Sequence, residues 1–235
     1  MAEQFKRFEL LVGKEALELL SHKKVAVFGL GGVGGNVCDA LARSGVGQLM
    51  IIDNDVVDIT NINRQLIANT EVVGQPKVDV MEKHLKSINP DIKIIKKKMF
   101  YLPENADEID LSDYDYVVDA IDTVVSKINI IFRCKTNGIN VISALGCGNK
   151  MDPSKLEITD ISKTSYDPLA KVLRRELRKL NINNLKVVYS RESPIKALDE
   201  TSTNNKHIPG SSAFVPPVAG IMIASEVVKD LIEGK

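Results

Sequence analysis

Short apolar runs alternate with segments of helical periodicity along the first 145 residues. The apolar runs lie at residues 24–30, 48–53, 92–96, 114–122 and 139–145, and the helical patterns between them cover residues 33–44, 77–87 and 126–137. This alternation is typical of βαβ units and predicts a parallel sheet. The runs VAVF and YVVDA are apolar almost throughout, which indicates strands that are covered by helices on both faces.

The pattern changes after residue 155. A strand is predicted at 156–161, a charged helix at 168–180, a strand at 186–190, a polar loop from 191 to 207 and a buried helix at 214–225. Within the polar loop, the segment 197–206 is expected to be mobile. A chain of 235 residues with 44% hydrophobic residues is long enough for one sizeable core. The fold class we expect is therefore α/β: a single domain, 1–235, whose Rossmann-like, mostly parallel sheet is extended by additional strands in the C-terminal half.

Composition excludes several classes of protein. Lys and Arg total 31 and Asp and Glu total 31, so nucleic-acid binding would depend on a local patch of charge. The three cysteines form no C-x-x-C pair, which argues against a disulfide framework and against a thiolate zinc site, and favours a reducing, cytoplasmic location. The N-terminus lacks the apolar stretch of a signal peptide, and no apolar run reaches the roughly 20 residues of a membrane span.

A glycine pattern follows the first predicted strand. Gly29, Gly31 and Gly34 form G-x-G-x-x-G, in which missing side chains let backbone N–H groups at a helix N-terminus approach phosphate. Asp53 ends the second strand 19 residues later, where a carboxylate can accept hydrogen bonds from ribose hydroxyls. With Asp55 in the same segment, these residues predict an adenosine nucleotide site in the half formed by residues 1–150.

Polar residues at the same edge of the sheet favour ATP over a nicotinamide dinucleotide. ATP carries about four negative charges, which need cationic side chains and a metal ion. Arg64 and Lys77 can face the triphosphate beside Asn61, and Asp122, after the fourth strand, can hold Mg²⁺ between phosphate oxygens. Asp119 is expected to be buried. A nicotinamide-dependent oxidoreductase is an alternative that leaves Arg64, Lys77 and Asp122 without a role. A nucleotide-binding scaffold without catalysis is another, which the intact set of triphosphate ligands disfavours.

The segments GLGGVGG, DNDVVDITNINRQ, GQPKV and VVDAID together resemble the ATP-binding core of the ubiquitin-activating superfamily, which includes the MoeB, ThiF and HesA adenylyltransferases. The resemblance implies that Asp53, Asn61, Arg64, Lys77 and Asp122 bind ATP and Mg²⁺. It also implies a homodimer, because an N-terminal arginine, here Arg7, completes the site of the neighbouring subunit. The enzyme it implies is of ligase type and releases AMP and pyrophosphate.

The second half, residues 151–235, resembles the tRNA threonylcarbamoyladenosine dehydratases of this superfamily in GNKMDPSKLEITDISKTSYDPLAKVLRRELRK, VVYSRE and PGSSAFVPPVAG. The chain departs from the family at Gly35, where a serine is expected. The resemblance implies that the threonyl carboxylate of a modified adenosine in tRNA is adenylated and that its side chain then closes into a ring. It also suggests a sulfur-acceptor protein of a cysteine desulfurase system as a partner. Activation of a ubiquitin-like sulfur carrier is the alternative.

The charged helix independently favours RNA. At about 100° per residue, four cations fall on one arc, and the leucines occupy the opposite side. These cations are Lys171, Arg174, Arg175 and Arg178. Such a ridge can contact a phosphate backbone, although an ordinary solvated helix face has the same pattern. Cys147, near the expected site, could act as a nucleophile or fill space, Cys38 and Cys134 are expected in the core, and His207 is a candidate of unknown role.

Overall fold

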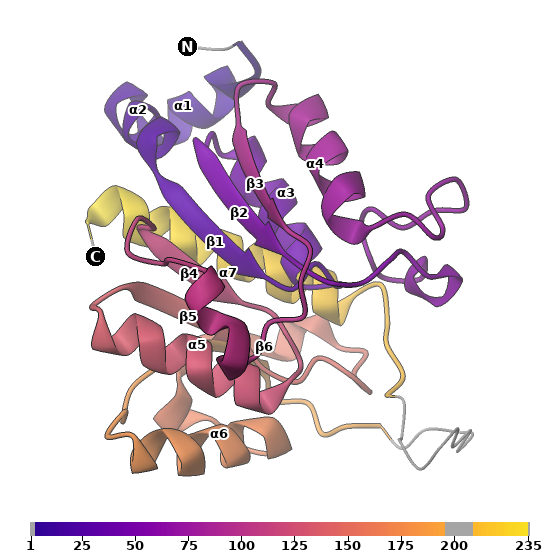
Figure 1. The fold of residues 1–235 in the computed structure, drawn as a ribbon, viewed down its shortest axis with the longest axis vertical. Helices are drawn as coiled ribbons and strands as arrows, with labels where there is room; N and C mark the ends of the chain where they lie inside the picture. Colours follow the sequence, from indigo (N-terminus) through magenta and orange to yellow (C-terminus); the bar gives the residue numbers. More distant parts are fainter. Residues whose placement is uncertain (1–2, 196–208, 235) are drawn as a thin grey trace.

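The computed structural model describes residues 3–195 and 209–234. Its elements form seven strands and seven α-helices, with short 3-10 helices between them (Figure 1). His207 and the segment 197–206, part of the predicted mobile loop, lie outside the described residues.

All seven described strands belong to one sheet. Their bounds are β1 Lys24–Phe28, β2 Gln48–Ile52, β3 Lys93–Lys97, β4 Tyr116–Asp119, β5 Asn140–Ala144, β6 Leu156–Asp160 and β7 Lys186–Ser190. The spatial order is β3-β2-β1-β4-β5-β7-β6, and every pair is parallel except β6 with β7. The predicted α/β class with a mostly parallel sheet is therefore confirmed, and β7 and β6 are the additional strands that extend it.

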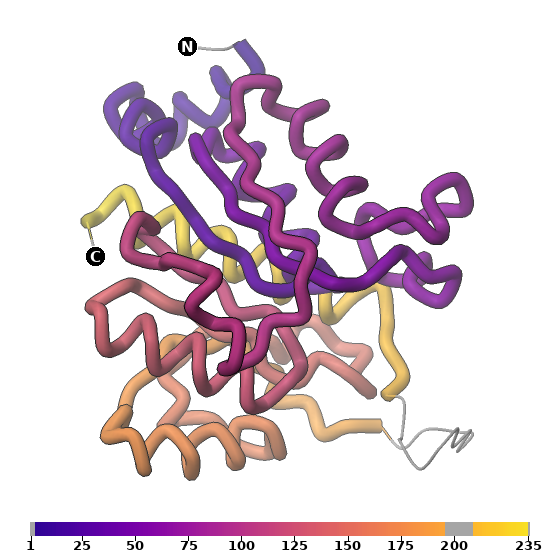
Figure 2. Tube along the Cα trace, in the orientation of Figure 1, coloured from indigo at the N-terminus to yellow at the C-terminus, as the bar shows by residue number. Residues whose placement is uncertain are grey.

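The α-helices are α1 Lys6–Val12, α2 Lys14–His22, α3 Gly34–Arg43, α4 Lys77–Ile88, α5 Val124–Thr136, α6 Pro168–Lys179 and α7 Val215–Glu233, and the 3-10 helices are η1 Glu3–Phe5, η2 Ile59–Asn61, η3 Pro103–Glu108, η4 Pro153–Lys155 and η5 Ile161–Lys163. Figure 2 shows the C-terminal α7 behind the sheet in this view, and α7 packs mainly against α3 from the beginning of the chain. The periodicity located α3 to α6 to within two residues but did not reveal α1 and α2, and α7 extends well beyond the predicted 214–225.

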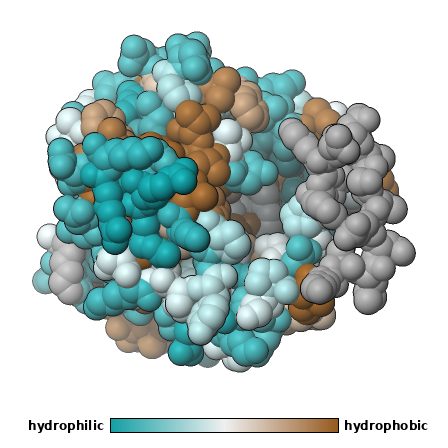
Figure 3. All heavy atoms as spheres, turned by 90° about the horizontal axis from the view of Figure 1, so that it is seen from below, coloured by the Kyte–Doolittle hydropathy of each residue, from teal (hydrophilic) through white to brown (hydrophobic). Residues whose placement is uncertain are grey.

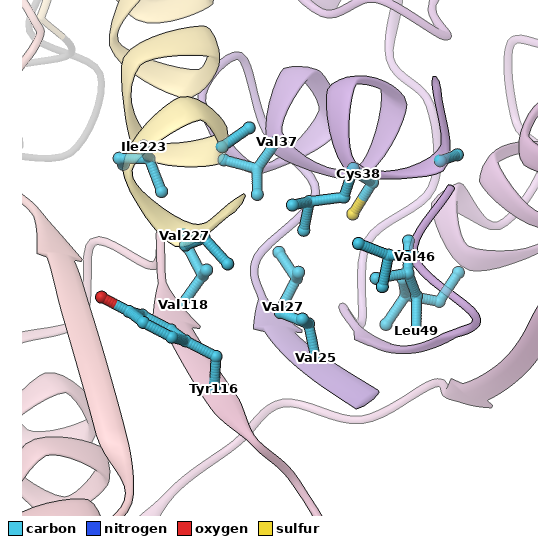
Figure 4. Packing of buried hydrophobic residues seen from close by; sticks show 14 of the residues in the cluster. Val25, Val27, Val37, Cys38, Val46, Leu49, Tyr116, Val118, Ile223 and Val227 are labelled. Carbon is cyan, nitrogen blue, oxygen red and sulfur yellow. The ribbon is translucent and has the colours of Figure 1, made fainter. Parts of the chain in front are cut away.

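Strand side chains alternate between two cores because successive residues of a strand point to opposite faces. Val25 and Val27 of β1 belong to a core that includes residues of α3, α4 and α7, whereas Ala26 and Phe28 belong to a core that includes residues of α5, α6 and η3. Figure 4 shows the first core, in which Cys38 lies among valines and leucines. Cys134 lies in the second core, so both cysteines have the predicted position.

Two further observations concern the described residues. None of their helices is long and apolar enough to cross a membrane. They also contain no group of three or more His, Cys, Asp or Glu side chains that could hold a metal ion.

Candidate active site

The glycine turn after β1 is required by close backbone contacts. Gly29 has φ +88°, and a Cβ on it would lie 2.7 Å from the carbonyl oxygen of Ala120. A Cβ at Gly34 would lie 1.8 Å from the carbonyl oxygen of Gly29, so only glycine allows α3 to start here. A Cβ at Gly31 would meet no atom within 4 Å. Gly31 therefore faces open space, where a ligand can approach the backbone.

A cavity of about 460 Å³ opens beside this turn at the carboxyl ends of β1, β2 and β4. The strand order reverses between β1 and β4, and ligands of open α/β sheets bind at such a switch point. The predicted residues that line this cavity are Gly29, Gly31, Asp53, Asp55, Asn61, Arg64, Lys77 and Asp122. The sheet thus brings the predicted nucleotide ligands together, except Gly34, which supports the turn from below, and Arg7.

Asp53 and Asp55 organise the floor of the cavity. One carboxylate oxygen of Asp53 accepts a hydrogen bond from the Leu30 amide over 2.7 Å, and the other accepts from the Asp55 amide over 2.8 Å. The ammonium group of Lys77, which is only 4% exposed, is paired with the Asp55 carboxylate at 2.8 Å. The structure therefore holds a buried cation at the start of α4, beside a carboxylate that partly neutralises it.

Asn61 and Arg64 reach the cavity from the segment after β2. Asn61 ends η2, and its side-chain oxygen accepts a hydrogen bond from the Asp58 amide, while its NH₂ group has no hydrogen-bond partner among the described residues. One terminal nitrogen of Arg64 donates to the carbonyl of Thr60 and to Asn63. The other guanidinium nitrogens make no hydrogen bond within residues 3–195 and 209–234, so they can donate to an anion in the cavity.

Apolar side chains form the opposite wall. Met99, Phe100 and Tyr101 follow β3, and together with Phe28 and Ile52 they line the cavity. Phe28 and Tyr101 make an edge-to-face contact with ring centroids 4.9 Å apart. Such a wall suits a planar base. The sequence reasoning missed these residues, although their position at the carboxyl end of a parallel strand could have indicated them.

A buried ion pair supports the loop that carries Asp122. Asp122 is exposed, and three residues before it Asp119 is fully buried, as predicted. The ammonium group of Lys127, also fully buried, contacts Asp119 at 2.9 Å and donates to the carbonyl of Ile121 at 2.9 Å. The hydroxyl of Ser143 also donates a hydrogen bond to Asp119, over 2.5 Å. The backbone immediately before Asp122 is therefore fixed from below by a group that sequence reasoning missed.

Gln65 is another residue of the site that sequence reasoning missed. It is 6% exposed and lines the cavity, and its side-chain oxygen has no hydrogen-bond partner among the described residues. A buried acceptor without a partner is costly, and a donor from a ligand or a water molecule relieves that cost.

Cys147 lies after β5 but does not line the cavity. It packs against the first core, and burial raises the pKa of its thiol to about 11. Such a thiol stays protonated at neutral pH, so the structure favours the packing role over the nucleophilic one.

The basic helix α6 has the predicted arrangement in part. Its leucine face is buried, and Figure 3, which views this side of the molecule, shows hydrophilic side chains gathered over α6. Lys171, Arg175 and Arg178 are exposed. Arg174 differs from the prediction: it is half-buried, and its guanidinium group donates inward to the carbonyls of Ile161 and Thr164. The ridge of exposed cations on α6 is therefore narrower than the helical periodicity predicted, and within it Arg175 is paired with Glu176.

Arg7 is exposed on α1 and does not reach the cavity of its own subunit. Beside it, Leu10 and Leu11 are each 82% exposed. An uncovered pair of leucines on one short helix is typical of a surface that contacts another chain.

Together these features define a class. The protein is a Rossmann-like nucleotide-binding protein whose switch-point cavity joins an apolar wall to cationic side chains suited to a triphosphate. More particularly, the chain belongs to the ThiF family, whose model matches residues 2–234.

Similarity to individual proteins supports this family assignment. The chain is 46% identical over 244 residues to the tRNA threonylcarbamoyladenosine dehydratase of Bacillus subtilis, covering 99% of this chain and 96% of that protein. A sulfur carrier protein adenylyltransferase of Thermus thermophilus is 40% identical over 116 residues, 49% of this chain and 42% of the relative. The match to the dehydratase thus includes the C-terminal half, whereas the match to the carrier-activating enzyme covers half of the chain.

Solved structures of the Escherichia coli tRNA N6-threonylcarbamoyladenosine dehydratase, TcdA, superimpose closely. The complex with AMP has a TM-score of 0.91 and the complex with ATP one of 0.90, each at 31% identity, covering 99% of this chain and 95% of the other. The same fold therefore holds an adenosine nucleotide in a relative.

Proposed function

We propose that this protein is an ATP-dependent dehydratase that adenylates the carboxylate of threonylcarbamoyladenosine in tRNA and promotes its cyclisation. The observation that carries the proposal is the convergence of Asp53, Arg64, Lys77 and Asp122 on one cavity at the switch point of the sheet. The similarity to the dehydratases over nearly the full chain supports the substrate.

The chemistry follows from a poor leaving group. A carboxylate oxygen does not leave until it becomes part of a phosphate ester, and attack on the α-phosphate of ATP makes it one. Arg64 and the buried Lys77 would stabilise the charge on the departing pyrophosphate, and Asp53 would orient the ribose. An internal nucleophile of the modified adenosine's side chain then attacks the activated carbonyl carbon, and cleavage of the bond from that carbon to AMP closes the ring, so no protein nucleophile is needed.

Mg²⁺ is the metal that this site suits. Mg²⁺ is commonly bound through one or two carboxylates together with substrate phosphates, and Asp122 presents an exposed carboxylate to the cavity. When bound, the ion would neutralise phosphate charge.

The assembly we propose is a homodimer in which the partner subunit's Arg7 completes each site. The exposed side chains of Leu10 and Leu11 beside Arg7 support this assembly, because a partner subunit would bury them. The whole chain, 1–235, acts as a single domain in this proposal, with substrate specificity in residues 151–235. RNA phosphates would contact Lys171, Arg175 and Arg178 on α6. A sulfur-acceptor protein is a partner that the resemblance alone suggests, and the three free cysteines fit a reducing compartment such as the cytoplasm.

Nucleoside mass spectrometry tests the reaction directly. Modified tRNA is incubated with enzyme and ATP and then digested to nucleosides. We expect a threonylcarbamoyladenosine product that is lighter by one water, formed together with AMP and pyrophosphate. Unchanged nucleoside in the presence of intact enzyme, ATP and Mg²⁺ would contradict the proposal.

ATP–pyrophosphate exchange separates the alternative substrate. Sulfur-carrier activation remains the second candidate because 116 residues, 49% of this chain, are 40% identical to a sulfur carrier protein adenylyltransferase. Exchange that depends on modified tRNA supports the dehydratase, and exchange that depends only on a carrier protein with a C-terminal diglycine supports the alternative.

Mixing two inactive variants tests the shared site. Arg7→Ala and Asp122→Ala should each be inactive as homodimers. Subunit exchange at equal concentration should restore about one quarter of wild-type activity, because half of the dimers are mixed and each has one intact site. Mixtures that stay inactive although mixed dimers form would show that Arg7 does not act across the interface.

A further inference from the structure

Tyr166 is an exposed aromatic residue in an unfavourable backbone conformation. Its side chain is 79% exposed, the highest value among the large aromatic residues that the structure describes as exposed. Its φ is +57°, in the left-handed region that tyrosine rarely adopts. An uncovered ring gains nothing from burial, so neither packing nor backbone preference explains a tyrosine here.

The residues on both sides of Tyr166 are held firmly. Thr164 is buried and receives hydrogen bonds from the guanidinium group of Arg174. Asp167 is buried and caps α6 by accepting from the Ala170 amide over 2.9 Å. Ser165 contacts the hydroxyl of the buried Tyr189. The inward-facing Arg174 thus belongs to a rigid frame that presents one ring to solvent.

This frame lies at the same edge of the sheet as the nucleotide cavity. The carboxylate of Asp167 approaches Lys150 at 3.8 Å, and the ammonium group of Lys150 donates to the carbonyl of Ser190, the last residue of β7. β7 is two strands away from β4, which leads to Asp122. With neighbouring strands about 4.8 Å apart, the Tyr166 frame begins about 10 Å along the edge from the reacting end of the cavity.

The surroundings of Tyr166 favour an RNA ligand. The side chain of Lys171, in the first turns of α6, is exposed and makes no hydrogen bond or ion pair with any described residue, and the same is true of the side chain of Lys163 in η5. Lys163 and Lys171 flank Tyr166 in the sequence. Proteins hold unpaired bases with exposed aromatic rings and cations, because every base has a face for stacking while lysines contact the phosphates.

We propose that Tyr166 is a stacking platform for an unpaired base of the RNA substrate, with Lys171 contacting a neighbouring phosphate. The proposal rests on the proposed function, since it assigns a contact for the tRNA that the cavity would modify. It adds a substrate-binding residue that lies outside the nucleotide site and outside the α6 ridge.

The affinity for unmodified tRNA tests the stacking contact of Tyr166. It is measured without ATP by fluorescence anisotropy at a series of salt concentrations. Tyr166→Asn removes the ring and keeps a residue that tolerates the left-handed conformation. We expect about five- to tenfold weaker binding, at the lower end of the range for loss of one base–aromatic stack, with an unchanged salt dependence. Tyr166→Phe should bind like wild type. Lys171→Gln should instead reduce the salt slope by about one.

Phe132→Gln is the matched control, because Phe132 is another exposed aromatic residue. It lies in the second half of α5, towards the amino edge of the sheet and away from the cavity. This variant should leave tRNA binding unchanged. A melting temperature of Tyr166→Asn at or above that of wild type shows that the fold is intact. Tyr166→Gly also removes the ring, and glycine adopts the left-handed backbone conformation without a steric cost, so its tRNA affinity provides a second comparison.

Turnover assays extend the test. The KM for tRNA should rise in Tyr166→Asn by the same factor as its affinity falls, with the KM for ATP unchanged. Wild-type affinity in both Tyr166→Asn and Tyr166→Gly would overturn the stacking proposal. Failure of wild-type enzyme to dehydrate modified tRNA would instead overturn the proposed function, whatever the variants do.

Discussion

Replacing Lys127 by Met tests how the loop before Asp122 is supported. Methionine has a similar length and lacks the ammonium group, so the change removes the contacts to Asp119 and to the carbonyl of Ile121. Asp119 is fully buried and would retain only the Ser143 hydroxyl as a side-chain donor. A carboxylate in that environment is strongly destabilised.

The magnitude follows from this burial. Removing one partner of a buried ion pair costs about 3–5 kcal/mol, whereas replacing both partners by uncharged groups is often close to neutral. For a chain of this size, each kcal/mol lowers the melting temperature by about 2–4 °C. We therefore expect Lys127→Met to melt about 10 °C lower, and Lys127→Met combined with Asp119→Asn to regain most of that loss.

Chemical denaturation and ATP–pyrophosphate exchange measure the two consequences separately. The double variant should be nearly as stable as wild type but should keep reduced exchange activity, because the Ile121 carbonyl still lacks its donor. The reasoning would be refuted by a single variant within about 1 kcal/mol of wild type, or by a double variant that is less stable than the single one. Full activity in a stable double variant would remove Lys127 from the positioning of Asp122.

Three further predictions concern single residues. Asp122→Ala should abolish adenylation with an unchanged melting curve, because the carboxylate is exposed, and pyrophosphate exchange checks it. Gly34→Ala should fail to fold, because its Cβ would lie 1.8 Å from a carbonyl oxygen, whereas Gly31→Ala should fold and lose ATP affinity in a calorimetric titration. Burial opposes ionisation of Asp39, but hydrogen bonds from His84 and Arg43 outweigh it and lower its pKa. That contribution to stability is complete above the unfolded pKa of about 4 and is lost as pH falls through the lower folded pKa, so Asp39→Asn should flatten the acid limb of the stability curve.

The candidate site could be predicted where one general rule applies. Parallel strands end at a common edge, so residues that follow predicted strands, such as Asp53 and Asp122, meet in space however far apart they lie in the sequence. The glycine turn was predictable for a similar reason, since only glycine permits the contact between Gly34 and Gly29. These are constraints of backbone geometry, and they leave a pattern in sequence.

Other residues left no such pattern. Helical spacing on α6 placed Arg174 on the same arc as the exposed cations. A long side chain can turn back towards Thr164, however, and helical spacing does not record the direction of a side chain. Lys127 lies in an amphipathic helix where a surface lysine is the ordinary expectation. The helix α1 carries Leu10 and Leu11 on an uncovered surface, so its pattern does not match burial within one chain.

The buried lysines among the described residues share one arrangement. Lys77, Lys127 and Lys150 are each at most 4% exposed, and each lies near an aspartate: Asp55, Asp119 and Asp167 respectively. All three pairs lie at the carboxyl edge of the sheet, but only Lys77 and Asp55 line the cavity. A site for a polyanion needs cations that are already in position, and a buried cation needs a nearby carboxylate to be tolerated. The pair in the cavity can therefore exchange its carboxylate contact for phosphate, whereas the two deeper pairs hold the loops around it in place.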